Sequence, residues 1–256
     1  MNGQIRDMEG SVKKTIELGI VFDTPYRPDV ILKAVAATQS IQKQPQGRDP
    51  MAGKRTTAIT WGPGRGKARV PRVKGAGTGA ASNAAFAPGT VGGRLAHPPR
   101  AEKILYKKIN KKEKDLARDS AIAATTNNRL IKERGHKIEN LDSPILIFDD
   151  KIQTIKKTKN LIELLEKIGL KEELERVGTK KIRPGKEKRR GMKYRVKKGP
   201  LIVAENQGLY DAARNITGLE VTSVNKLSVE HLAPGGLAGR LVIWSESSIN
   251  AINQRT

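Results

Sequence analysis

Residues 45–100 restrict the fold of this chain more than any other stretch. Here ten Lys or Arg residues accompany a single acid, Asp49, among many Gly, Ala and Pro residues. Large apolar side chains are rare, so folding the stretch alone would bury too little apolar surface to offset the lost conformational entropy. We therefore predict that residues 45–100 form a long extended loop without a hydrophobic core.

A second basic stretch occupies residues 179–200, with eleven Lys or Arg residues and one acid, Glu187. The two stretches carry net charges of +9 and +10, which leaves +4 of the chain's +23 for all other residues. Two concentrated basic stretches on a nearly neutral body are typical of nucleic-acid binding. Long Gly-rich extensions suit the crevices of folded RNA better than a DNA groove, so RNA is the favoured partner.

The remaining residues have the composition of an ordinary folded domain. At 256 residues, one domain with a long insertion is favoured over two independent domains, because the insertion has no core. We predict a globular α/β domain from residues 1–44 and 101–256, with 45–100 inserted as a loop and 179–200 as a second basic protrusion.

The chain contains no cysteine, which excludes disulfides and thiolate metal sites. No apolar signal sequence or membrane span is present, so we expect a soluble cytoplasmic protein without a membrane partner.

Short apolar runs alternate with amphipathic helical patterns through the second half of the chain. We predict strands at residues 144–148, 201–204, 219–224 and 241–244. We predict helices at residues 28–44, 110–124, 160–168, 171–177, 209–216, 228–232 and 246–254, with further helical turns up to Arg134. Since parallel strands need crossover connections, this order predicts a three-layer α/β domain with a mostly parallel sheet of about four strands. Residues 4–8 and 12–18 are predicted to form a short N-terminal hairpin that turns at Glu9-Gly10.

Two glycine-rich motifs resemble nucleotide-binding loops but fail the tests for them. In Gly62–Lys67, three residues separate the first Gly from the Gly-Lys pair, whereas a phosphate loop needs four. Ala68 follows the pair, where a phosphate loop has Ser or Thr. Gly75–Ala80 fits the dinucleotide pattern, yet no credible strand precedes it and no acid lies about twenty residues further on. We predict no nucleotide and no other cofactor.

Candidates for catalysis are equally weak. His97, His136 and His231 have no metal-ligand spacing to one another. Asp149 and Asp150 follow a predicted strand and are the best acidic pair for an enzyme, but adjacent side chains in a strand point to opposite faces. The sequence therefore predicts no catalytic residue and no metal site.

The basic stretches supply the candidate RNA contacts. Arg and Lys bind phosphates, and the rings of Trp61, Phe86 and Tyr194 can stack on unpaired bases or else pack on their own neighbours. The predicted RNA-binding residues are Arg48, Lys54, Arg55, Trp61, Arg65, Lys67, Arg69, Arg72, Lys74, Arg94, His97, Arg100, Lys180, Lys181, Arg183, Lys186, Lys188, Arg189, Arg190, Lys193, Tyr194 and Arg195.

Several motifs occur together in an order that resembles one protein family. They are Arg65–Arg72 (RGKARVPR), Gly92–Arg94 (GGR), Ala96–Glu102 (AHPPRAE), Ile109–Glu113 (INKKE), Ser120–Thr125 (SAIAAT) and Leu232–Gly235 (LAPG). Together they resemble the L-four family of large-subunit ribosomal proteins, in its archaeal and eukaryotic form. The chain ends soon after its last predicted helix, which is the archaeal pattern.

The resemblance implies a structural constituent of the large ribosomal subunit that performs no chemistry. Its partners would be large-subunit (23S-type) ribosomal RNA, neighbouring ribosomal proteins and the nascent peptide, because the family's long loop reaches the wall of the peptide exit tunnel. The tunnel-lining residues implied in this way are Gly64, Arg65, Gly66, Lys67, Ala68, Arg69, Val70, Pro71 and Arg72. Two alternatives are a free RNA-binding regulator and an RNA-modifying enzyme built around Asp149 or Asp150.

Overall fold

The computed structural model describes residues 1–141, 143–205 and 207–254. The chain divides into two units. Met1–Gln39 and Lys107–Thr256 form one, which we call the body, and Ser40–Tyr106 form the other, which we call the loop unit. The loop unit contains the predicted loop of residues 45–100 and extends a few residues beyond it at both ends.

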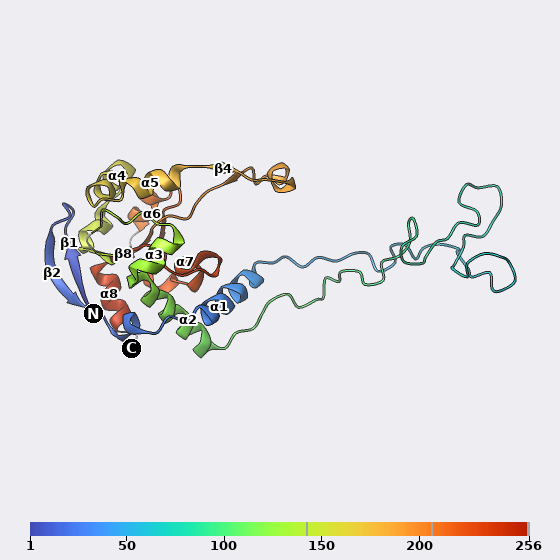
Figure 1. The fold of residues 1–256 in the computed structure, drawn as a ribbon, viewed down its shortest axis with the longest axis horizontal. Coiled ribbons are helices and arrows are strands. Elements are labelled where there is room, and N and C mark those ends of the chain that lie inside the picture. Colours follow the sequence, from blue (N-terminus) through green and yellow to red (C-terminus); the bar gives the residue numbers. More distant parts are fainter. Residues whose placement is uncertain (142, 206, 255–256) are drawn as a thin grey trace. The chain divides into compact units, whose positions relative to one another are not determined.

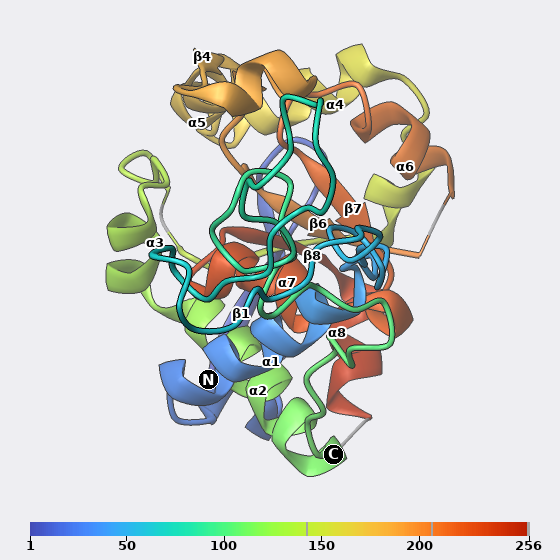
Figure 2. The ribbon, with the colours of Figure 1, turned by 90° about the vertical axis from the view of Figure 1, so that its right-hand side faces the viewer.

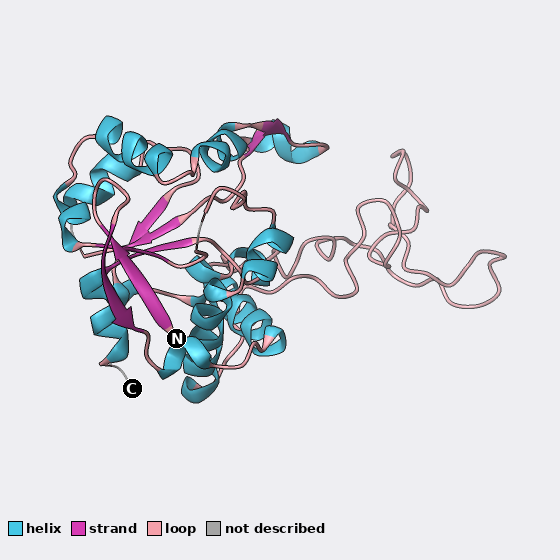
Figure 3. Cartoon of the chain, turned by 60° about the vertical axis from the view of Figure 1, so that its left-hand side comes forward, coloured by secondary structure: helices cyan, strands magenta, loops and turns pink. Residues whose placement is uncertain are grey.

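A six-stranded sheet forms the centre of the body, in the order β2-β1-β3-β8-β6-β7. The strands are β1 (Asn2–Arg6), β2 (Val12–Glu17), β3 (Leu146–Phe148), β6 (Leu201–Val203), β7 (Glu220–Thr222) and β8 (Val242–Ser245). Every neighbouring pair is parallel except β1 and β2. Figure 3 shows these strands between helices, so the predicted α/β class with a mostly parallel sheet is confirmed.

The expected number of about four strands is too small. All four predicted parallel strands are present, but the N-terminal hairpin joins them, with Ile5 opposite Ile147 and Arg6 opposite Phe148. Pairing with β2 leaves the backbone N–H and C=O groups along the other edge of β1 without partners. Parallel pairing with β3 provides hydrogen bonds for that edge. Hairpin sequences show their local turn but not which further strand will pair with them.

Eight α-helices and several short 3-10 turns surround the sheet or flank it in the described chain. The helices are α1 (Pro28–Ile41), α2 (Lys111–Ala123), α3 (Asn128–Arg134), α4 (Thr158–Lys167), α5 (Lys171–Gly178), α6 (Gln207–Ala213), α7 (Val229–Leu232) and α8 (Glu246–Asn253). The 3-10 turns are η1 (Ile20–Asp23), η2 (Ala124–Thr126), η3 (Asp150–Thr154), η4 (Lys186–Arg190), η5 (Val224–Lys226) and η6 (Pro234–Gly236). Helix α3 ends at Gly135, whose φ of 93° is the left-handed conformation that glycine adopts without strain.

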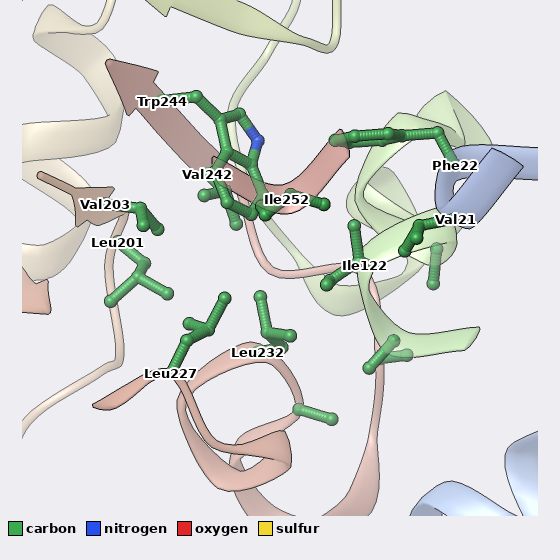
Figure 4. Close-up of a cluster of buried hydrophobic side chains, with 14 of the residues drawn as sticks. Val21, Phe22, Ile122, Leu201, Val203, Leu227, Leu232, Val242, Trp244 and Ile252 are labelled. Atoms are coloured by element: carbon green, nitrogen blue, oxygen red, sulfur yellow. The ribbon is translucent and has the colours of Figure 1, made fainter. Parts of the chain in front are cut away.

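The sheet separates two apolar cores. Ile147, Val242 and Trp244 point into a core with residues of α1, α2, α7 and α8. Leu146 and Ile243 point the other way, into a core with residues of α3, α4, α5 and α6. Successive strand side chains alternate between faces, which explains why uninterrupted apolar strands serve both cores. Figure 2 shows α1, α2 and α8 on one side of the strands and α4, α5 and α6 on the other, and Figure 4 shows the first core.

The loop unit contains no helix or strand between residues 42 and 106, all of which the structure describes. Figure 1 shows this part as an extended trace. The two ends of the trace are adjacent, because the Arg48 N–H donates to the Pro99 carbonyl at 3.1 Å. Further along, a Cβ on Gly53 would lie 2.5 Å from the Gly93 carbonyl oxygen, so only glycine allows this approach of the two chain segments.

Candidate nucleic-acid interface

Arg72 organises the tip of the loop unit. Its backbone pairs with Ile59 through two hydrogen bonds of 2.9 and 3.0 Å, and it also forms a bridge with Ala84. The half-buried guanidinium group donates to the Ser82 carbonyl at 2.9 Å and to the Ala68 carbonyl at 3.4 Å. Arg72 therefore joins three segments of chain and separates the tip into two smaller loops, residues 60–71 and 73–83.

The first small loop gathers cations around Trp61. The Arg65 guanidinium carbon lies 5.7 Å from the Trp61 ring centroid, and the Lys67 ammonium lies 5.3 Å from it. These are cation–π distances, and the Trp61 ring remains half-exposed. Stacking of Trp61 on a base therefore stays a prediction. Arg65, Lys67 and Arg69 are themselves exposed and can meet an anion.

The rest of the loop unit holds the remaining predicted contacts of the first basic stretch. Arg94 lies over the Phe86 ring at 5.7 Å. Arg55 binds Asp49, the only acid of the stretch, and its hydrogen bonds lower the pKa of the Asp49 carboxyl. The other predicted residues of this stretch are exposed, namely Arg48, Lys54, Lys74, His97 and Arg100.

The second basic stretch forms a short ribbon in the body. Strands β4 (Lys181–Ile182) and β5 (Tyr194–Arg195) pair antiparallel and are connected through η4, and Figure 1 shows them leaving the body beside α5. Arg183 is half-buried and pairs with Glu187 at 3.3 Å. Lys193 lies 5.5 Å from the Tyr194 ring centroid. The other predicted residues are exposed, namely Lys180, Lys181, Lys186, Lys188, Arg189, Arg190 and Arg195.

A buried polar cluster anchors the ribbon at the end of α5. Arg176 donates to both oxygens of the fully buried Glu173 carboxylate at 2.7 Å and to the Lys198 carbonyl at 3.0 Å. Glu173 also accepts the His136 Nδ1 hydrogen bond of 2.6 Å and the Lys137 N–H. Because His136 Nε2 accepts the Leu241 N–H at 3.4 Å, the proton lies on Nδ1 and the ring is neutral.

The pKa values of this cluster follow from burial and hydrogen bonding. Burial lowers the pKa of His136. Burial alone would raise the pKa of Glu173, but the hydrogen bonds from Arg176 and His136 outweigh it and lower that pKa to about 2. The Glu173 carboxylate is therefore charged and fully partnered at neutral pH.

Arg240 forms a second buried polar anchor, where the chain leaves the ribbon and enters β6. Its buried guanidinium group binds the Glu220 carboxylate at 2.6 Å and the carbonyls of Gly199 and His231 at 2.8 Å. Lys198 also pairs with Glu220. Both anchors were missed from the sequence. The available signal was an isolated charge inside an apolar pattern at Arg240, which lies between Gly239 and Leu241. Glu173 lies among other charged residues and gave no such signal.

The acidic pair of the enzyme alternative does not converge on one site. Asp149 Oδ2 lies 2.8 Å from the Lys13 ammonium, whereas Asp150 Oδ1 accepts hydrogen bonds from the Ser247 N–H and hydroxyl at the start of α8. Within residues 1–141, 143–205 and 207–254, no group of three or more His, Cys, Asp or Glu side chains is arranged to hold a metal ion. In the same ranges, no helix is long and apolar enough to cross a membrane.

An α/β body with a coreless basic loop and a basic ribbon defines a nucleic-acid-binding protein. The sequence profile of the Ribosomal protein L4/L1 family matches residues 16–255, and the chain belongs to this family. The family consists of structural, non-enzymatic proteins, which removes the RNA-modifying enzyme as an interpretation. The predicted family resemblance is thus confirmed.

Three archaeal proteins named large ribosomal subunit protein uL4 illustrate the similarity. The chain is 47% identical over 250 residues to that of Methanosphaera stadtmanae, covering 97% of this chain and 95% of the relative. It is 45% identical over 254 residues to that of Sulfolobus acidocaldarius, with 98% and 93% coverage. It is 43% identical over 258 residues to that of Methanococcus vannielii, with both chains fully covered.

Proposed function

We propose that this protein is a structural constituent of the large ribosomal subunit, where it binds large-subunit ribosomal RNA and contacts neighbouring ribosomal proteins in the cytoplasm. Family membership supports this role, and the relatives carry the name of a large-subunit protein. The observation that carries the RNA-binding role is the loop unit. Its residues 42–106 adopt defined turns with no helix, strand or apolar core, and only one acid offsets the ten cations of residues 45–100.

A bound polyanion would stabilise such a segment for two physical reasons. The cations repel one another unless counter-charges lie between them, and phosphate groups provide a charge at each nucleotide. Small Gly and Ala side chains let RNA approach the backbone closely, so the same residues that prevent a core favour packing inside RNA. The predicted RNA-binding residues of both basic stretches belong to this proposal.

The nascent peptide is a further proposed partner, through Gly64–Arg72 at the wall of the exit tunnel. The motif RGKARVPR at Arg65–Arg72 supports the proposal, and so does the first small loop, whose exposed Arg65, Lys67 and Arg69 give it a positive surface. A photo-crosslinker at position 65 in assembled ribosomes is expected to label ribosomal RNA and the nascent peptide. The same crosslinker at position 189 should label RNA alone, and equal peptide labelling from both positions would contradict the tunnel assignment.

Sedimentation distinguishes a ribosomal constituent from a free RNA-binding regulator. After fractionation of a cell extract at moderate salt, most of the protein should sediment with the large subunit. Recovery of most of it in the slowly sedimenting fractions would favour the regulator. A variant lacking the loop residues 55–95 should shift toward those fractions, because it loses eight predicted RNA-binding residues, including all those of the loop tip.

A further inference from the structure

A cavity of about 720 Å³ lies at the base of the β4–β5 ribbon, within the body. It is open to solvent and lies between helix ends, the ribbon and η6, and its lining also includes Pro234 and Gly235. Six cationic side chains line it, namely Arg134, Arg176, Lys181, Arg195, Lys197 and Lys198. No Asp or Glu lines this cavity among the described residues.

Only part of this positive charge is compensated nearby. Glu173 binds Arg176, and Glu220 binds Lys198, although Glu220 is shared with Arg240. Arg134 donates instead to the backbone carbonyls of Pro234 and Leu237. Of the described carboxylates, none forms an ion pair with Arg134, Lys181, Arg195 or Lys197.

Positive charges lie close together in two places. Burial, followed by the charges of Arg240 and Arg176, lowers the pKa of Arg134 to about 10. In the ribbon, Lys181 lies directly opposite Arg195. Like charges at facing positions destabilise a strand pair, and strands of two residues have few other contacts to offset this. An anion in the cavity would relieve both repulsions.

We propose that this cavity is a phosphate-binding pocket that holds the backbone of the bound RNA, a proposal that rests on the RNA-binding function above. Guanidinium groups bind phosphate oxygens through charged N–H donors, and Arg134 and Arg176 are held in place by their carbonyl and carboxylate partners. The pocket continues into the ribbon, whose exposed cations follow without interruption by acids other than Glu187. A chain of regularly spaced phosphates fits this continuity better than an acidic peptide.

The decisive variant is K181Q/K197Q, which removes two exposed cations that have no carboxylate partner in the described chain. Its matched control is K156Q/K167Q, which removes two exposed cations from the body outside the pocket. Inorganic pyrophosphate is the probe, followed by NMR at the Gly235 amide and the Arg134 Nε–H. We expect saturable shifts at both groups, with affinity about tenfold lower in K181Q/K197Q and little changed in the control. Absent shifts, or equal losses in both variants, would overturn the pocket.

An RNA measurement assigns the ligand. With a large-subunit ribosomal RNA fragment, K181Q/K197Q should reduce the slope of log K against log salt by about 1.4 to 1.8, the contribution of two phosphate contacts, and by more than the control does. If wild type binds the RNA and the two variants behave alike, the pocket assignment fails while the proposed function stands. If wild type binds pyrophosphate but no RNA, the proposed function fails as well.

Two further measurements test for an acidic protein ligand and for loss of folding in the variants. Displacement of pyrophosphate by poly-glutamate at lower concentration than by RNA would identify an acidic protein as the ligand and overturn the RNA assignment. Thermal melting by circular dichroism checks folding of each variant. If K181Q/K197Q is unfolded, R195Q at the facing ribbon position provides the same test, with reduced affinity for pyrophosphate and RNA expected and unchanged affinity contradicting the pocket.

Discussion

At the scale of single residues, Glu173 differs from the other described carboxylates of the body in being buried. It is fully buried and accepts hydrogen bonds from His136, Lys137 and Arg176. Substitution E173A would leave the Arg176 charge and the His136 N–H without their partner. We expect the free energy of unfolding, measured by urea denaturation, to fall by about 3 to 5 kcal/mol.

The neighbouring Glu172 is the control for this substitution. Glu172 is exposed, and among the described residues it accepts one side-chain hydrogen bond, of 3.5 Å from Asn140. E172A should change the free energy of unfolding by no more than about 0.5 kcal/mol. Equal effects of E172A and E173A would show that the buried cluster does not anchor the body.

The same cluster makes stability depend on pH. The pKa of Glu173 falls from 4.5 to about 2 on folding, so its contribution is present above pH 4.5 and is lost as pH falls toward 2. The lowered pKa of His136 acts in the same direction below 6.5, since the folded state resists protonation. Between pH 4.5 and 2, wild type should lose about 3 kcal/mol more unfolding free energy than E173Q, which cannot ionise at this position. Parallel pH profiles of the two proteins would contradict this.

Arg72 and Arg69 allow a structural role in the loop tip to be distinguished from a role in RNA binding. Both are predicted RNA contacts, but Arg72 holds the Ser82 and Ala68 carbonyls while Arg69 is exposed. R72A should therefore speed proteolytic cleavage within residues 59–84 of the isolated protein several-fold, whereas R69A should not. Each should reduce the salt slope of RNA binding by about 0.7 to 0.9 if its side chain meets one phosphate. Equal cleavage rates would mean that Arg72 does not organise the tip.

Residue types were sufficient to locate the cations but not their partners. The list of predicted contacts includes Lys181 and Arg195, yet it omits Arg134 and Arg176, which lie in ordinary amphipathic helices. Trp61 was a candidate for base stacking, and only the three-dimensional structure shows Arg65 and Lys67 over its ring. Whether a ring or cation is available depends on distances of a few ångströms, and composition does not contain them.

At the scale of elements, the loop unit is expected to be dispensable for folding of the body. All residues of the two apolar cores lie outside residues 40–106, so the loop adds nothing to them. Replacing residues 55–95 by a short Gly-Ser linker should leave a cooperative thermal transition in circular dichroism. Since loop length changes closure entropy only slowly, the free energy of unfolding should change by about 1 kcal/mol or less.

Loss of the cooperative transition would show that the loop takes part in the folded core. A length-matched linker provides the control, because it separates the effect of loop length from that of loop sequence. Both linker variants should also lose most of their affinity for ribosomal RNA, which distinguishes a functional loop from a passive connection.

Strand and helix order was predictable because apolar runs and amphipathic patterns carry it. Residues 144–148, 201–204 and 219–224 each contain an observed strand, and 241–244 overlaps β8, which extends one residue further to Ser245. The β4–β5 ribbon was not predicted, since strands of two residues composed mainly of charged side chains have no apolar periodicity. The pairing of β1 with β3 was likewise not predictable, because it joins positions about 140 residues apart.

At the scale of the whole molecule, concentrated charge predicts a steep dependence of RNA binding on salt. If some ten cations meet phosphates, log K should fall with log salt at a slope of roughly −7 to −9. Filter binding of a large-subunit ribosomal RNA fragment over a salt series measures the slope. Removing residues 55–95 should reduce its magnitude by about half. A slope near −2 for the intact chain would mean that most of these cations do not contact RNA.

The sequence by itself determined the distribution of charge, the absence of a core in residues 45–100, the α/β class and the family. These properties depend on composition, local periodicity and motif order, all of which are present in the linear chain. Only the tertiary structure decided that the hairpin completes the sheet, that Arg72 organises the loop tip, and that cations from α3, α5 and the ribbon surround one cavity. Those features arise because folding brings together segments that are distant in the sequence, and the energy of a charge depends on what lies within a few ångströms of it.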